Sequence, residues 1–380
     1  MANSLGSAVL EMGERAVPVL RESAVLPRLI TNDVDPVPSE KGQVIVFPKA
    51  DAGTVRNVTP GVYGTNVDVT ASRVSITLNQ WKEAPYQMSD KDYAEVMEGY
   101  IPAQAEENLR ALVNDVDGAL AQGMNDSFPN YGGTAGTTPF ATNLGAFKTA
   151  RVGINRNAAP LSNRACVLDA DAEGNALILG NFLKADERGD QGGIIEGQIG
   201  KKLGAVWYLD QNVVTQATHT LNVTAAILTK ATQAVGDTTI VLDATSLTGS
   251  LLTGHLLSFS SSKQQYIVTA TCTAATNEIS VPVFPAVATA ISSGVTCTVI
   301  GAHTANLLFH RGAYAFASRP LGTGQYPAGE GFASTTIVDD VSGLAIRLTV
   351  SRQHYQWTTS WDILYGHGSL RPEWGAKILG

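Results

Sequence analysis

The sequence predicts a mixed α+β protein that carries a small inserted all-β domain. Apolar residues recur at helical spacing between positions 93 and 120, and segments of alternating apolar and polar residues lie on both sides of that region. Residues 216–302 differ sharply in composition from both flanks. The chain has 380 residues and 44% hydrophobic content, which is enough for more than one core.

The N-terminal part predicts an arm followed by an extended loop. Residues 5–24 place apolar side chains at helical spacing and predict a short amphipathic arm. Residues 40–88 contain runs of alternating apolar residues around a polar, turn-rich segment at 51–61. This pattern predicts a long β-hairpin whose tip is solvated.

The strongest helical signal lies between positions 89 and 122. Ser89-Asp90-Lys91-Asp92 is typical of a helix start, and apolar residues follow at helical spacing as far as Leu120. Pro102 is expected to kink or divide this helix, because it removes one backbone donor and crowds the preceding turn. The acidic residues lie mostly off the apolar stripe, which predicts a solvated or inter-subunit face rather than a carboxylate site.

Alternating strands and helices after position 140 predict an α/β or α+β layer. The patterns predict helices over 143–154 and 173–179, a short helix over 314–318, and strands at 165–168, at 306–310 and within 334–365.

Residues 216–302, here called the insert, predict a small all-β domain. Among 87 residues they contain five charged side chains and 26 Ser or Thr. Short β-type runs alternate there with Gly, Asn and Ser turns. An insertion whose two ends lie close together adds surface without disturbing the host fold.

Charge and cysteine content narrow the class of protein. A net charge of −8 and a pI near 5.3 argue against a protein that wraps nucleic acid by neutralising phosphates. Cys166, Cys272 and Cys297 show no CxxC spacing and are odd in number, so we expect free thiols in a reducing cytoplasm, with pairing of Cys272 and Cys297 as the alternative. The N-terminus has no basic region before its apolar stretch, and no apolar run approaches a membrane span, so neither export nor a membrane partner is expected.

The motifs that suggest chemistry have simpler structural explanations. Asp169-Ala-Asp171-Ala-Glu173-Gly174 resembles the start of a calcium loop, but Gly180 stands where a bidentate Glu is needed, so we expect a helix cap. The glycines between 322 and 331 precede a β-type run rather than a helix, which indicates a loop and not a phosphate site. Hydrolase, zinc-protease, P-loop and kinase motifs are absent from the sequence, and we expect no enzyme activity, cofactor or metal.

The C-terminal segment Trp361-Asp-Ile-Leu-Tyr-Gly-His-Gly-Ser-Leu-Arg-Pro-Glu-Trp374 is similar to the closing segment of coat proteins from short-tailed Salmonella-type phages. In that family an aromatic-Tyr-Gly stretch leads into Arg-Pro-Glu, and the sharp matches here are Tyr365-Gly366 and Arg371-Pro372-Glu373. The resemblance implies the Hong Kong phage capsid fold. It assigns an N-terminal arm to 1–38, an extended loop to 40–88, a spine helix within the peripheral domain to 89–122, the rest of the peripheral and axial domains to 123–215 and 303–380, and an inserted β domain to 216–302.

The resemblance also implies a function. It implies a major capsid protein of a tailed double-stranded DNA bacteriophage, made in the host bacterial cytoplasm and located in the virion. Copies would assemble as hexamers and pentamers into an icosahedral head, with a scaffolding protein, a portal protein, a decoration protein and packaged DNA bound without sequence specificity as partners.

Two sets of residues are expected to act in assembly. Inter-subunit contacts are expected at charged residues of the hairpin and the helix, namely Arg73, Lys82, Glu83, Glu106, Glu107 and Arg110. Flexing of the helix during shell expansion is expected at Gly99 and Pro102. Two alternatives are a surface adhesion or carbohydrate-binding protein, in which the Ser/Thr-rich β domain carries recognition, and an enzyme with an unrecognised site.

Overall fold

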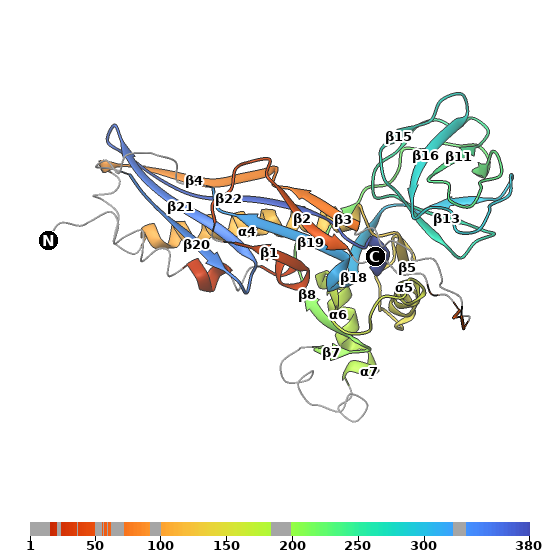
Figure 1. The fold of residues 1–380 in the computed structure, drawn as a ribbon, viewed down its shortest axis with the longest axis horizontal. Coiled ribbons are helices and arrows are strands. Elements are labelled where there is room, and N and C mark those ends of the chain that lie inside the picture. Colours follow the sequence, from red (N-terminus) through yellow and green to blue (C-terminus); the bar gives the residue numbers. More distant parts are fainter. Residues whose placement is uncertain are drawn as a thin grey trace.

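The computed structural model is elongated, with long strands at one end and the insert at the other (Figure 1). The structure describes residues 16–20, 24–35, 37–49, 55, 57, 58, 60, 61, 72–91, 100–183, 199–321 and 332–380. Strands and helices both contribute to its cores, so the predicted α+β class is confirmed. None of the helices in the described part of the chain is long and apolar enough to cross a membrane.

A six-stranded sheet forms the extended half of the molecule (Figure 1). Its strands, in spatial order, are β1 (Thr31–Val34), β19 (Tyr314–Arg319), β22 (Gln356–Ser369), β21 (Leu344–Gln353) and β20 (Phe332–Asp339), while β4 (Gln80–Ser89) also pairs with β22. All these pairings are antiparallel except that of β1 with β19. This sheet is called the long sheet below.

Helix α4 (Tyr100–Asn125) covers one face of the long sheet. Its buried stripe includes Leu109, Val113, Val116 and Leu120, each with 0% exposure, at the spacing of one helical face. At about 1.5 Å per residue, its 26 residues extend about 39 Å. The short helix α2 (Leu26–Leu29) and the helical residues 16–20 pack on the same core.

The opposite face of the long sheet carries a β-hairpin. Its strands, β2 (Val44–Lys49) and β3 (Ser72–Thr77), pair in antiparallel register. Phe47 and Ile76 of the hairpin pack against Leu364 of β22. The hairpin is shorter than predicted, because β4 does not belong to it and instead pairs with β22 along its full length.

A second sheet packs against the C-terminal part of α4. Its strand order is β5 (Asn130–Gly133), β23 (Gly375–Leu379), β18 (His303–His310), β6 (Arg164–Leu168), β8 (Ala205–Leu209) and β7 (Lys201–Lys202), with β9 (Thr215–Gln216) paired to β18. Helices α5 (Gly145–Arg156), α6 (Ala170–Ile178) and α7 (Gly180–Leu183) follow in the same region. Side chains of α5 and α6 pack on one face, and the other face contacts the core of α4.

The insert forms a separate β body at one end of the molecule (Figure 1). One sheet has the strand order β10 (Leu228–Thr229), β11 (Thr239–Asp243), β16 (Glu278–Phe284), β14 (Gln265–Val268), β13 (Leu256–Phe259) and β17 (Cys297–Val299). Strands β12 (Ser250–Leu251) and β15 (Cys272–Thr273) pair separately. The two ends of the insert are adjacent, since Gln216 of β9 is paired with His303 of β18.

One predicted helix is wrong. Residues 314–318 form strand β19, in which Tyr314 and Phe316 pack toward α4 while Ala315 and Ala317 pack toward the hairpin. Both faces of this strand are covered, so its alternation is between large and small apolar residues rather than between apolar and polar ones.

Candidate assembly surfaces

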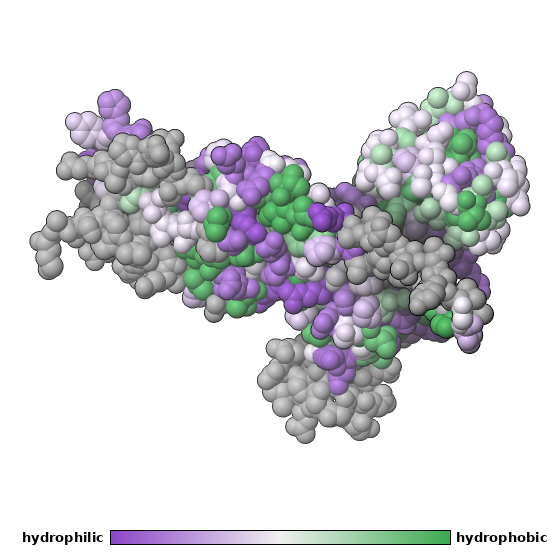
Figure 2. All heavy atoms as spheres, viewed as in Figure 1, coloured by the Kyte–Doolittle hydropathy of each residue, from purple (hydrophilic) through white to green (hydrophobic). Residues whose placement is uncertain are grey.

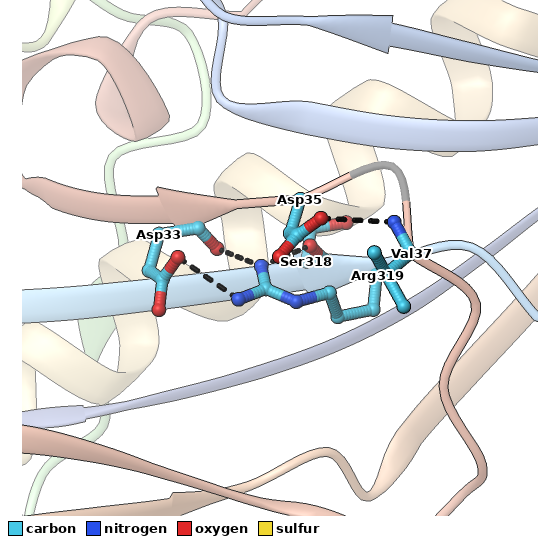
Figure 3. Close-up of polar contacts among 5 residues, drawn as sticks. All are labelled: Asp33, Asp35, Val37, Ser318 and Arg319. Atoms are coloured by element: carbon cyan, nitrogen blue, oxygen red, sulfur yellow. Dashed lines mark hydrogen bonds and ion pairs between the residues drawn. The ribbon is translucent and has the colours of Figure 1, made fainter.

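The N-terminal segment is fixed to the long sheet through Arg319. Its guanidinium donates to the Asp33 carboxylate at 2.9 Å and to the backbone carbonyls of Asp33 at 2.8 Å and Ser318 at 3.0 Å (Figure 3). The Asp35 carboxylate next to it accepts the backbone N–H of Val37 at 2.9 Å. These bonds hold β1 against β19 and set where the chain leaves the sheet toward the hairpin.

A buried carboxylate links the same segment to α4. Asp117 Oδ2 accepts the backbone N–H of Val25 at 3.0 Å, immediately before α2. Burial raises the pKa of Asp117 to about 7, the bond from Val25 opposes that rise, and the neighbouring Asp210 adds to it. The contact between the N-terminal segment and α4 therefore depends on a carboxyl group that is protonated more readily than an exposed one.

The hairpin has one covered face and one open face. Phe47 and Ile76 point into the core, whereas Val44 and Val46 on the other face are 50% and 48% exposed. Gly366 of β22 permits this packing, because a Cβ there would meet the Thr77 carbonyl oxygen at 2.3 Å. The Tyr-Gly pair therefore has a structural role, in which Tyr365 is buried beneath the sheet and Gly366 lets the hairpin approach it.

The Arg371-Pro372-Glu373 segment forms the turn between the two sheets. Pro372–Trp374 is a 3₁₀ turn, labelled η2, that connects β22 to β23. The Arg371 guanidinium lies 4.8 Å from the centre of the Trp374 ring. Asn130 and Asn157 both donate to the Glu373 carbonyl, at 3.0 and 3.1 Å. This motif thus positions the second sheet relative to the first.

The residues predicted to make inter-subunit contacts do not converge on one site. Arg73, Lys82 and Glu83 are exposed on β3 and β4. Lys82 forms an ion pair with Asp115 of α4 at 3.5 Å, which joins β4 to the helix within the same subunit.

The structure describes four of the five helix residues that were predicted as contacts or flexing points. Glu107 and Arg110 of α4 pair with each other at 2.8 Å, and Glu106 is half-buried. Pro102 falls in the first turn of α4 as described, and Gly99 lies outside the described residues.

The calcium-like segment forms a helix cap, and the glycine-rich segment between 322 and 331 lies outside the described residues. Asp169 is the N-cap of α6 and accepts the backbone N–H of Ala172, as predicted for the calcium-like segment. Within the described ranges, His, Cys, Asp and Glu nowhere gather in a group of three or more that could hold a metal ion. Cys166, Cys272 and Cys297 are all free, so the alternative pairing inside the insert is not formed.

The insert meets the second sheet through a polar, buried junction. Lys377 of β23 is fully buried and donates to the Gly254 carbonyl of the insert at 2.9 Å. Burial lowers the pKa of Lys377 to about 7, while the nearby Asp126 acts in the opposite direction. Burial also lowers the pKa of His303 to about 4.

A second set of contacts lies at the free edge of β5. The Gln265 side chain accepts the Tyr131 N–H at 2.8 Å and donates to the Tyr131 carbonyl at 3.0 Å. Leu256 and Ile267 of the insert bury Leu379 of β23 nearby. The insert therefore closes the β5 edge of the second sheet, which would otherwise present unpaired backbone groups.

A cleft of about 960 Å³ separates α5 from the insert. Its cationic lining residues are Lys148 and Arg156 from α5 and Lys263 from the insert. Sequence reasoning missed these residues, because they come from two distant segments and match no motif. Only the helical spacing of Lys148 and Arg156, eight residues apart, indicates that they share one face.

No protein-family model and no curated protein sequence matches this chain. Solved structures that resemble it include phage capsids. A structure from Mycobacterium phage Che8 shares 16% identity and a TM-score of 0.47, with 89% of this chain and 84% of that chain covered. The capsid of Cyanophage P-SCSP1u shares 13% identity and a TM-score of 0.49, covering 94% and 88%.

A virus-like particle from Pyrococcus furiosus gives 8% identity and a TM-score of 0.43, with 98% of this chain and 99% of that chain covered. At such identities the likeness assigns the chain to no family, so its function is argued from its own residues.

Proposed function

We propose that this chain is the major capsid subunit of a tailed double-stranded DNA bacteriophage and has the Hong Kong phage capsid fold. The observation that carries the proposal is the order of elements along the chain. An N-terminal segment on β1 is followed by the β2–β3 hairpin, the 26-residue helix α4, and two sheets with a separate β body between β9 and β18. This order is the one implied by the resemblance at residues 361–374.

The open face of the hairpin supports self-association. An isolated two-stranded hairpin is marginally stable in water, and this one exposes Val44 and Val46 on the side away from the long sheet. A neighbouring subunit that covers this face would bury the two valines. Arg73 of β3 and Glu83 of β4 are exposed and are proposed contacts with a neighbouring subunit, as is the half-buried Glu106 of α4.

The proposed assembly is a shell of hexamers and pentamers built on a scaffolding protein and joined to a portal protein. Packaged DNA would lie inside without sequence-specific contacts, and a decoration protein could bind outside. In this assembly the work of the protein is mechanical, because the subunit supplies surfaces and hinges rather than a reaction.

We also propose that the insert is an accessory domain of the coat subunit. It has its own buried core, which includes Ile240, Leu242 and Tyr266, and its two ends lie next to each other. Its visible surface in Figure 2 is mostly pale, in keeping with its Ser and Thr content. The insert is therefore expected to contact neighbours through hydrogen bonds more than through ion pairs.

Electron microscopy of the recombinant full-length chain tests the proposal. Closed shells or capsomer-sized rings are expected at high protein concentration, alone or with the scaffolding protein. A monodisperse monomer at all concentrations that binds an oligosaccharide would overturn it and favour the adhesion alternative.

A further inference from the structure

The cleft between α5 and the insert has a one-sided charge. Lys148 and Arg156 project into it from one face of α5, with Val152 between them, and Lys263 faces them from the turn between β13 and β14. All three cations are exposed, and none makes an ion pair with a residue in the described part of the chain. Among the described residues that line the cleft, no side chain is acidic.

The rest of the lining suits a polypeptide. Ser262 and Thr289 add hydroxyl groups, which can donate to and accept from a peptide backbone, whereas the amides of Asn130, Asn157 and Gln264 are already bonded within the chain. The volume of about 960 Å³ is at the upper end of that of small-ligand pockets, which leaves room for several residues of a chain. Figure 1 shows α5 beside the insert at the end of the molecule. The cleft can be reached from outside, because Lys148, Arg156 and Lys263 are exposed.

An acidic turn lies at the opposite edge of the same sheet. The cleft adjoins β5, at one end of the strand order, whereas α6 begins beside β8, near the other end. The first turn of α6 carries Asp171, which is exposed, and Glu173, which lies against β8. Burial raises the pKa of Glu173.

We propose that this cleft receives the acidic first turn of α6 from a second copy of this chain, an inference that rests on the proposed self-assembly. Complementary charges at opposite edges of one sheet define a head-to-tail contact, and contacts of this type form a ring when the rotation between successive copies closes. A nucleic acid is the less favoured occupant, because three cations on a chain of net charge −8 give little phosphate neutralisation.

Charge reversal tests this contact. The variant Lys148→Glu/Arg156→Glu/Lys263→Glu changes only exposed side chains, so its circular dichroism and thermal unfolding should match those of the wild type. Sedimentation velocity should show that half-association needs about tenfold more protein, since Asp171 and Glu173 can form two pairs with the cleft, each contributing up to about 1 kcal/mol, and both are replaced by repulsion. Added salt should weaken association of the wild type and not of this variant.

A charge swap supplies the matched control. Asp171→Lys/Glu173→Lys alone should weaken association, and combining it with the cleft reversal in one chain should restore it, which measures the coupling between the two surfaces. Asp169 is left unchanged because it caps α6.

Three results would overturn the inference. If the wild type assembles and the cleft variant assembles equally well, the cleft proposal fails while the capsid proposal stands. If the wild type never associates, both fail. If the cleft variant loses affinity only for a labelled double-stranded oligonucleotide, the cleft binds nucleic acid and not a second copy.

Discussion

The insert and the remainder of the described chain, called the host here, are stabilised by different kinds of polar contact. The host joins its strands and helix α4 with ion pairs, which include Arg347–Asp362, Arg319–Asp33, Arg352–Asp90 and Lys82–Asp115. The insert has the pair Lys230–Glu278 and an Asp237 carboxylate that accepts the Ala234 N–H, and most of its other side-chain hydrogen bonds join neutral groups. Thr229, for example, donates to the Ser292 carbonyl at 2.7 Å and accepts the Val295 N–H at 3.0 Å.

The difference indicates that charged groups in the host serve to fix strands relative to one another. In the host, Asp362 accepts two bonds from Arg347, at 2.9 and 2.7 Å, and one from the Trp81 indole at 3.1 Å, so one buried carboxylate joins three strands. Such a group fixes particular strands relative to one another. The insert is held by hydrogen bonds between its own segments, around its own core, which suits a body that folds without its neighbours.

The largest expected effect tests whether the two regions unfold separately. Trp361 is 1% exposed in the host core, and Trp361→Ala should lower the free energy of unfolding of the host by about 3–5 kcal/mol. All five tryptophans of the chain lie outside 216–302, so their fluorescence reports the host alone. Hydrogen exchange of insert peptides, followed by mass spectrometry, should be unchanged.

Leu242→Ala is the matched variant in the insert. Leu242 is 0% exposed in the insert core, and its truncation should cost about 2–5 kcal/mol there while the tryptophan transition stays in place. If either variant destabilises both regions equally, the insert and the host are one cooperative unit and the boundary at 216–302 is wrong.

The pH response is the next expected effect. The pKa of Asp117 rises from 3.8 to about 7 in the folded chain, so the folded state keeps a proton that the unfolded state has lost in this range. Host stability should therefore fall as pH rises from about 4 to about 7, by up to about 1.4 kcal/mol per pH unit. Tryptophan fluorescence during denaturant unfolding at several pH values measures this slope.

Asp117→Asn is the control for that slope. The Asn side chain retains an acceptor for the Val25 N–H and does not titrate, so this part of the pH dependence should disappear. His303 works in the opposite direction, because its lowered pKa of about 4 makes the junction with the insert weaken as pH falls from about 6.5 to about 4. An unchanged slope in Asp117→Asn would show that the carboxyl group is not responsible.

The sequence predicted those elements whose periodicity depends on one solvent-exposed face. Helix α4 has one buried stripe, and β21 is buried at every second residue from Ile346 to Val350, because the other side of each is more exposed. Strand β19 is covered on both sides, so Ala315 and Ala317 carried no strand signal and a helix was predicted instead. The partner of β4 was missed for another reason: pairing with β22 joins residues about 280 positions apart, as in the Trp81–Asp362 bond.

The candidate surfaces were less predictable than the fold. Asp169 was identified as a cap because its role depends on its own neighbours in the chain. The cleft between α5 and the insert brings Lys148 and Lys263 together from two bodies, and no local pattern encodes that proximity.

A smaller effect is expected from the glycine under the hairpin. Gly366→Ala should destabilise the host by about 1–3 kcal/mol, because the new methyl group would meet the Thr77 carbonyl oxygen at 2.3 Å and push β3 away. Gly368, two residues later on β22, has its nearest such neighbour at 3.4 Å, so Gly368→Ala should be nearly neutral. Hydrogen exchange at β2 and β3 should increase only in the first variant. Equal exchange in both variants would mean that Gly366 does not position the hairpin.

The smallest effect concerns the neutral hydrogen bonds of the insert. Thr229→Val keeps the shape of the side chain and removes both the bond to the Ser292 carbonyl and the acceptor for the Val295 N–H, at a cost of about 1 kcal/mol. Thr298 is exposed on β17, and Thr298→Val should leave insert stability unchanged. Because the lost bonds carry no charge, the difference between the two variants in hydrogen exchange should be the same at low and high salt. A difference that shrinks as salt is added would mean that charge contributes to the insert as it does to the host.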